Sequence, residues 1–148
     1  MNGIAVKLKA GKINNEYVSA AHIASLHEAT LREKGKCYFS TKLQMKPERA
    51  PFIDTLLIFN KDENFYYLCS VEQVRVGVLV GAFLPDDAAA FSPAPYAVEP
   101  STTWFLLTSM QRVDKDALSG LHVTGKTGVS FIEMIDKSSR FPRFYFEG

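Results

Sequence analysis

The feature that most constrains the fold is a pair of apolar runs within residues 54–76, DTLLIFNKDENFYYLCSVEQVRV. The runs TLLIF and FYYLCSVEQV are rich in β-branched and aromatic residues, which favour strands. Between them lies NKDEN, whose Asn and Asp residues are typical of tight turns. The segment therefore predicts a β-hairpin near the middle of the chain.

Further strands and helices are predicted on both sides of this hairpin. Alternating apolar and basic residues over 3–9 indicate an edge strand with one wet face. A turn is expected over 11–15, and Ser19 as N-cap with Gly35 as stop signal delimits a helix. We also predict strands over 36–42, 102–113 and 140–146, a turn or short helix over 114–118, a short helix over 128–137, and loops over 43–52 and 85–101.

The order of these elements indicates the fold class. Strands joined by a hairpin, with helices inserted between them, argue for an antiparallel or mixed sheet rather than repeated βαβ units. We therefore expect an α+β protein, with a small curved mixed β-sheet or open β-barrel flanked by a few helices. The length of 148 residues fits one domain spanning 1–148.

Composition excludes several classes of protein. Hydrophobic residues make up 47% and charged residues 22%, which argues against global disorder. No apolar stretch approaches the length of about 18 residues that a membrane helix needs, and the first residues lack the apolar block of a signal peptide. We therefore expect a cytoplasmic protein without membrane association, in which Cys37 and Cys69 are buried reduced thiols.

No constellation for catalysis or metal binding is evident. His22 and His27 are five residues apart, so on a helix they point to different faces and cannot chelate one metal as an i, i+4 pair could. TGKTG at 124–128 resembles the end of a phosphate loop, but Leu121 stands where the earlier glycine is needed. We therefore expect no enzyme activity, no cofactor and no metal.

Positive charge is local rather than global. The formal net charge of +1 gives no overall attraction to nucleic acid or membrane. A basic face is nevertheless one interpretation of three clusters of positive charge: Lys7, Lys9 and Lys12; Lys34, Lys36, Lys42 and Lys46; and Lys137, Arg140 and Arg143. A set of solvated side chains is the simpler one.

Aromatic residues next to predicted loops point to a binding pocket. A large apolar side chain in a loop must contact the core, a partner or a ligand. A flat pocket walled by aromatic rings suits a nucleobase, because stacking contributes about 1–3 kcal/mol per base. Core filling is the alternative for Phe91 and Trp104. The candidate nucleobase contacts are Tyr38, Ser40, Thr41, Phe91, Tyr96 and Trp104.

Four segments resemble the PUA-like superfamily. They are KCYFSTK, DTLLIFNKDENFYYLCSVEQV, WFLLTSMQRVDKDAL and the GKTGVSFIEMI tail. The nearest likeness is to the YTH and EVE domains, with the ASCH domain more distant, and it covers about residues 19–146. The resemblance implies a barrel-like fold that binds a modified or flipped nucleobase in an aromatic cage.

The resemblance also implies residue roles. Tyr38 falls where YTH domains place a cage tryptophan, and Ser40 and Thr41 match the Ser-Thr that follows. An aromatic residue of the 85–101 loop would supply a second wall, and Lys126 lies near the place where a basic side chain meets phosphate.

The sequence departs from the YTH pattern in three respects. Tyrosine replaces tryptophan at Tyr38, the loop tryptophan is absent, and Lys36 stands where an asparagine is expected. These departures argue against N6-methyladenine in particular, and they leave open another modified base, ordinary RNA or a lost pocket.

These observations predict a nucleic-acid-binding module, with RNA or DNA as the partner. Its candidate phosphate contacts are Lys36, Lys42, Lys126 and Arg140. This function requires that Tyr38 and a ring of the 85–101 loop line one solvent-accessible hollow. The alternative is a non-catalytic protein-interaction or accessory domain, for example the specificity part of a defence or restriction system. The near-neutral net charge and an exposed first strand would favour that alternative, because a free edge allows strand addition.

Overall fold

The computed structural model describes residues 1–78, 81–137 and 142–148. The strands of its main sheet are β1 (Asn2–Lys7), β4 (Cys37–Thr41), β5 (Thr55–Asn60), β6 (Phe65–Val76), β7 (Thr103–Arg112), β8 (His122–Val123) and β9 (Arg143–Glu147). The other elements are the strands β2 (Gly11–Ile13) and β3 (Glu16–Val18), the α-helices α1 (Ala20–Lys34), α2 (Ala88–Phe91) and α3 (Phe131–Asp136), and the 3-10 helices η1 (Pro47–Phe52), η2 (Ala94–Tyr96) and η3 (Lys115–Leu118).

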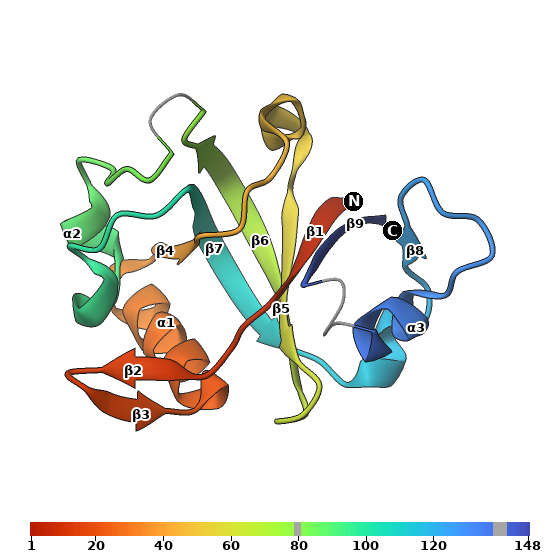
Figure 1. Cartoon of the computed structure of the whole chain (residues 1–148), viewed down its shortest axis with the longest axis horizontal. Coiled ribbons are helices and arrows are strands. Elements are labelled where there is room, and N and C mark those ends of the chain that lie inside the picture. The colour runs from red at the N-terminus through yellow and green to blue at the C-terminus, as the bar shows by residue number, and fades with distance from the viewer. Residues whose placement is uncertain (79–80, 138–141) are drawn as a thin grey trace.

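The main sheet is mixed, with strands in the order β4-β7-β6-β5-β1-β9-β8. Within the described residues, β1 and β5 are the parallel pair, and the other neighbours run antiparallel. The order ends at β4 on one side and β8 on the other, so the described sheet is not closed into a barrel. The chain is thus a mixed α+β fold with a few helices, as expected (Figure 1).

The predicted hairpin and central helix are both present. β5 and β6 pair from Thr55 opposite Ser70 to Asn60 opposite Phe65, with residues 61–64 as the connection. Helix α1 begins where expected, because the side-chain oxygen of Ser19 accepts a hydrogen bond from the His22 amide at 3.1 Å. It ends at Gly35, whose φ of 80° is the left-handed conformation that glycine adopts without strain.

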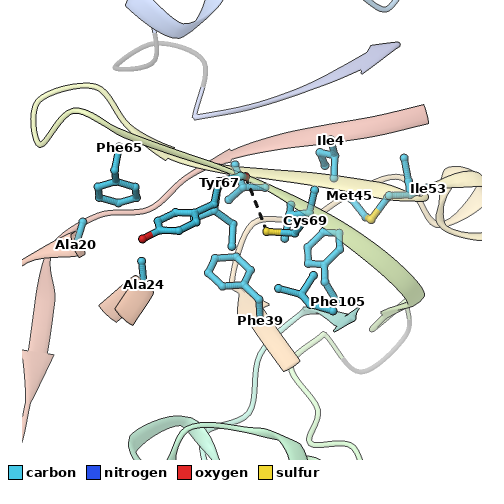
Figure 2. Close-up of a cluster of buried hydrophobic side chains, with 14 residues drawn as sticks. Ile4, Ala20, Ala24, Phe39, Met45, Ile53, Phe65, Tyr67, Cys69 and Phe105 are labelled. Carbon is cyan, nitrogen blue, oxygen red and sulfur yellow. Dashed lines mark hydrogen bonds between the residues drawn. The ribbon is translucent and has the colours of Figure 1, made fainter. Parts of the chain in front are cut away.

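Side chains of the central strands alternate between two apolar clusters on opposite faces of the sheet. On β1, Ile4 and Val6 join a cluster that includes Ala20 and Ala24 of α1, whereas Ala5 joins a second cluster. The second cluster contains three residues of α3 and both buried phenylalanines of β9. Figure 2 shows the first cluster, in which rings from β4, β6 and β7 pack together with Ala20 and Ala24 of α1.

The prediction that the first strand lies at the sheet edge is wrong. β1 lies between β5 and β9, and Ile4, Ala5 and Val6 are buried. The residues that alternate with Ile4 and Val6 on β1 are small rather than polar. At Gly3 there is no room for a side chain, because a Cβ would overlap the ring of buried Phe146. The basic residues Lys7 and Lys9 lie at the end of the strand and just after it. Their spacing therefore does not indicate a solvent-exposed face of β1.

Several expected loops contain short elements. The turn over 11–15 is part of a small antiparallel hairpin of β2 and β3, and the 85–101 loop includes α2 and η2. The loop over 43–52 contains η1. Cys37 and Cys69 are buried and free, as expected. Within the described part of the chain, no helix is both long and apolar enough to span a membrane.

The close packing at Gly3 predicts a specific loss of stability. Gly3→Ala adds a methyl group against the Phe146 ring, and overpacking of this kind costs about 1–3 kcal/mol. Gly120→Ala is the matched control, because nothing lies within 4 Å of a Cβ at that position. Urea denaturation of the two variants should give a clearly lower midpoint for Gly3→Ala. Equal midpoints would contradict the packing described for β1.

Candidate functional site

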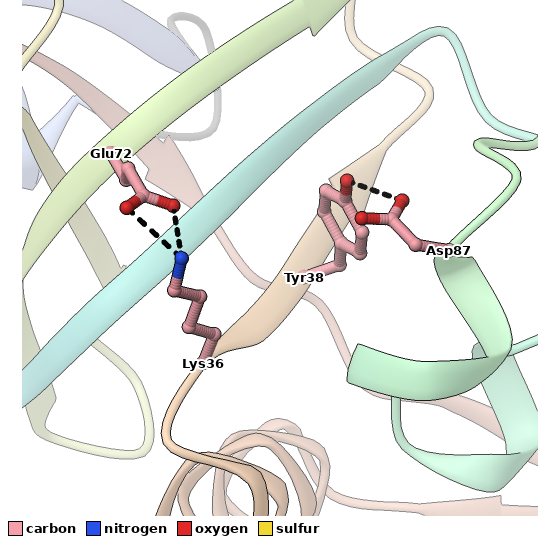
Figure 3. A network of polar contacts seen from close by, with 4 residues as sticks. All are labelled: Lys36, Tyr38, Glu72 and Asp87. Atoms are coloured by element: carbon pink, nitrogen blue, oxygen red, sulfur yellow. Dashed lines mark hydrogen bonds and ion pairs between the residues drawn. The ribbon is translucent and has the colours of Figure 1, made fainter.

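Three of the expected base-binding aromatics fill the interior instead. Tyr38 is 3% exposed and Trp104 is 1% exposed, and their rings meet edge-on with centroids 5.5 Å apart. Half-buried Phe91 packs against the same cluster. The Tyr38 hydroxyl donates a hydrogen bond of 2.7 Å to Asp87 (Figure 3). Tyr38 therefore does not line a solvent-accessible hollow, which corrects the arrangement expected from the sequence.

The alternation of β4 explains this placement. Neighbouring strand residues point to opposite faces of a sheet, so Tyr38 and Phe39 cannot share a site. Tyr38 packs with Ala88 of α2, whereas Phe39 belongs to the cluster beneath α1. Burial, with the hydrogen bond to Asp87, raises the pKa of Tyr38 to about 12. Tyr38 is therefore a structural residue with a protonated hydroxyl.

A cavity of about 500 Å³ lies on the Phe39 side of β4. Its walls come from the end of β1 and the segment after it, from α1, from the end of β4, and from η2 with the residues that follow. The volume falls within the range of about 300–1,000 Å³ that small-molecule pockets occupy. Four residues expected from the sequence line it: Ser40, Thr41, Lys42 and Tyr96.

Three rings form the aromatic part of the wall. The His27 ring lies between the other two, with its centroid 5.3 Å from that of Phe39 and 5.4 Å from that of Tyr96. Burial, together with the negative charge of Glu99, raises the pKa of Tyr96, so its hydroxyl stays protonated at neutral pH. The cavity thus offers an aromatic surface with a hydroxyl at one end.

His27 lines this cavity as a neutral ring. It is 3% exposed, and its Nδ1 lies 2.8 Å from the carbonyl oxygen of Ile23. A carbonyl can only accept, so Nδ1 carries the proton and Nε2 keeps a lone pair. Burial lowers the pKa of His27 to about 4, which leaves the ring uncharged at neutral pH. Within the described residues, no side chain or backbone group donates to Nε2.

The cavity wall carries an excess of positive charge. Lys7, Lys9, Lys12 and Lys42 line it, together with Glu99. The Glu99 carboxylate lies 3.6 Å from the Lys42 ammonium. For the other three lysines, the described part of the chain provides no ion-paired carboxylate. The site therefore attracts anionic groups at its rim.

The other expected cations lie elsewhere. Lys36 donates two hydrogen bonds, of 2.8 and 3.0 Å, to the Glu72 carboxylate (Figure 3). Lys126 lines a separate cavity of about 540 Å³ in the loop after β8. Arg140 lies outside the described residues. The structure thus brings Lys42 to the aromatic cavity, but not Lys36 or Lys126.

Helix α1 is held in place by side chains of the central hairpin. The Glu63 carboxylate accepts hydrogen bonds from the amides of Ala20 and Ala21 at 2.8 and 3.0 Å. A negative charge at a helix N-terminus also interacts favourably with the helix dipole. The Tyr67 hydroxyl donates to the Glu28 carboxylate at 2.7 Å, one residue after His27. These contacts fix the helix that presents His27 to the cavity.

Groups suited to nucleophilic or metal chemistry are scarce in the described residues. Burial raises the pKa of the Cys37 thiol to about 12 and raises that of Cys69 as well, so both stay protonated. In residues 1–78, 81–137 and 142–148, no group of three His, Cys, Asp or Glu side chains is arranged to hold a metal ion.

Comparison of the chain with protein-family models, with curated proteins and with solved structures gives no match.

Sequence reasoning overlooked the residues that form most of the aromatic wall. The available signal was a helical one: Ala20, Ile23, Ala24 and His27 follow the 3, 1 and 3 spacing of one buried helix face. An imidazole in that position must find a polar partner or a polar cavity. The cluster of Lys7, Lys9 and Lys12 was visible in the sequence, but only the fold places it around the same cavity as this histidine.

The buried neutral state of His27 predicts a loss of stability in acid. The unfolded ring binds a proton near its ordinary pKa of 6.5, whereas the folded ring does so at about 4. Between these values the unfolded state holds more protons, so stability falls as the pH decreases through this window. The expected loss is about 3 kcal/mol. Below about pH 4 both states are protonated, and His27 contributes no further change.

Urea denaturation at several pH values tests this prediction. His27→Gln should lose the part of the pH dependence that lies between pH 6.5 and 4, whereas His22→Gln, at an exposed position of the same helix, should keep it. Parallel pH profiles for wild type and His27→Gln would show that His27 titrates normally.

Proposed function

We propose that this chain is a non-catalytic nucleic-acid-binding module in which the cavity beside α1 receives a nucleobase. The observation that carries the proposal is the combination of an aromatic wall with four lysines around one cavity. Nucleic acids present these two chemistries together, a flat ring and a nearby phosphate. The resemblance to the PUA-like superfamily favours the same function, and membership of that superfamily is part of the proposal.

The base would contact the wall formed by Phe39, His27 and Tyr96. Its polar edge would meet the hydroxyl group of Thr41, which lies on the Phe39 face of β4, and the lone pair on Nε2 of His27. These groups include a donor and an acceptor, so they can read the edge of a base by hydrogen bonds. Tyr96 and Thr41 keep the roles expected from the sequence, whereas Phe39 and His27 replace Tyr38 in the aromatic wall. Ser40 lines the cavity, but its side chain lies on the Tyr38 face of β4.

The lysines at the rim would hold the phosphates. Lys7 and Lys9 lie at and just beyond the end of β1, and Lys42 follows β4. Such contacts fix the position of the strand and carry no sequence information. Because Glu99 already pairs with Lys42, the lysines after β1 provide the stronger attraction.

The alternative of a protein-interaction domain loses one of its two supports, because β1 is paired on both sides and is not a free edge. The near-neutral charge still fits it, whereas the aromatic wall with lysines around one cavity favours nucleic-acid binding.

Removal of the Tyr96 ring tests the base contact. Tyr96→Ala should weaken binding of a fluorescein-labelled single-stranded oligonucleotide by about 5- to 150-fold, since stacking on one aromatic ring contributes about 1–3 kcal/mol. Tyr96→Phe keeps the ring and should bind within a few-fold of wild type. Fluorescence anisotropy at low salt measures both. Equal affinities for wild type and Tyr96→Ala would exclude the ring from the site.

The salt dependence of binding tests the phosphate contacts. Four lysine contacts to a single strand predict a slope of about −3 for log K against log salt concentration, and each lost contact changes it by about 0.7. Lys9→Gln should therefore give a shallower slope than wild type. Lys36→Gln should leave the slope unchanged, because Lys36 pairs with Glu72 away from the cavity. If Lys36→Gln changed the slope and Lys9→Gln did not, the phosphates would bind near Lys36 and not at the cavity.

A further inference from the structure

The hairpin of β2 and β3 forms one side of the cavity. Its two-residue turn, Asn14 and Asn15, has φ values of 52° and 66°, which match the turn type that joins tightly paired strands. One face of the hairpin is turned toward α1: a Cβ at Gly11 would lie 3.7 Å from Cδ1 of Ile23. The hairpin therefore has one face against the helix. Figure 1 shows it beside α1.

Tyr17 lies on the opposite face of this hairpin. Its side chain is 83% exposed, the highest value among the exposed large hydrophobic residues in the described chain. Lys12 is its cross-strand partner, and the Lys12 ammonium lies 4.7 Å from the centre of the Tyr17 ring. A ring held in this way, with most of its surface in water, contributes little to the core.

Lys12 connects this ring with the cavity. It lines the cavity together with Lys9 and Gly11, and it also contacts Tyr17. An exposed ring and a cation beside a base-sized cavity match a nucleotide chain, in which a phosphate links one base to the next. Aromatic side chains that stack successive bases beside cationic groups are the usual means of single-strand binding.

We infer that Tyr17 is a second stacking site, which binds the base next to the one in the cavity while Lys12 contacts the intervening phosphate. The inference rests on the proposed function and narrows its substrate class to single-stranded oligonucleotides rather than free nucleotides or duplexes. In a duplex the base faces are stacked on one another, so Tyr17 could not reach them.

The experiment compares one nucleotide with a short strand. The probes are the four nucleoside monophosphates and fluorescein-labelled single strands of about eight nucleotides, a length within the range that single-strand modules cover. Strands of the same sequence, made as RNA and as DNA, show which of the two nucleic acids binds more tightly. Wild type, Tyr17→Ala, Tyr17→Phe and Tyr96→Ala are titrated at the same low salt concentration.

The expected pattern separates the two aromatic sites. Tyr17→Ala should weaken strand binding by about 5-fold or more, with monophosphate binding unchanged, whereas Tyr17→Phe should bind strands like wild type. Tyr96→Ala should weaken binding of both kinds of probe. Phe52→Ala is the matched control, because Phe52 is 70% exposed but lines a different cavity. Because Tyr17 and Phe52 are exposed, neither substitution should affect folding.

Two results would overturn the inference in different ways. In the first, wild type binds strands, Tyr96→Ala weakens this binding and Tyr17→Ala does not. The cavity then keeps its proposed function, and the second site is refuted. If neither strands nor monophosphates bind to wild type, the proposed function fails and the inference fails with it. Equal weakening by Tyr17→Ala and Phe52→Ala would also refute the inference, since the effect would not be local to the hairpin.

Discussion

The position of helix α1 on the sheet determines where the cavity lies. Ala20 and Ala24 of this helix pack against the apolar face built from β1 and its neighbours, and burial of that face is the main force that holds the helix. Glu63 of the central hairpin then binds the first helical amides. Since His27 lies on the same buried face, these contacts place a neutral imidazole at the boundary between core and cavity.

The alternation of side chains along β4 divides the aromatic residues between two environments. Tyr38 packs with Trp104 in a cluster closed by α2, and its hydroxyl is occupied by Asp87. Phe39, the next residue, faces α1 and the cavity. An aromatic cage made from Tyr38 is therefore incompatible with this fold, whereas a wall made from Phe39, His27 and Tyr96 leaves about 500 Å³ for a ligand.

Local signals in the sequence predicted where helices and strands begin and end better than they predicted which strands lie next to one another. The hairpin at 54–76 and the limits of α1 depend on turn and cap residues that act within a few positions, and both are confirmed. The place of β1 depends on distant partners: Gly3 and Ala5 give room for rings of β9, which the alternating pattern alone does not reveal. The face of β4 that meets the cavity likewise depends on where α1 and α2 pack.

The most direct test of the account is a map of the contact surface by NMR. Chemical shifts of labelled protein are followed as a single-stranded oligonucleotide is added. The account predicts the largest changes at the backbone amides of Thr41, Leu43 and Tyr96. It predicts little change in the indole signal of buried Trp104, whose N–H donates to the carbonyl oxygens of Phe83 and Ser101. Changes centred on Trp104, with the cavity amides unmoved, would contradict it.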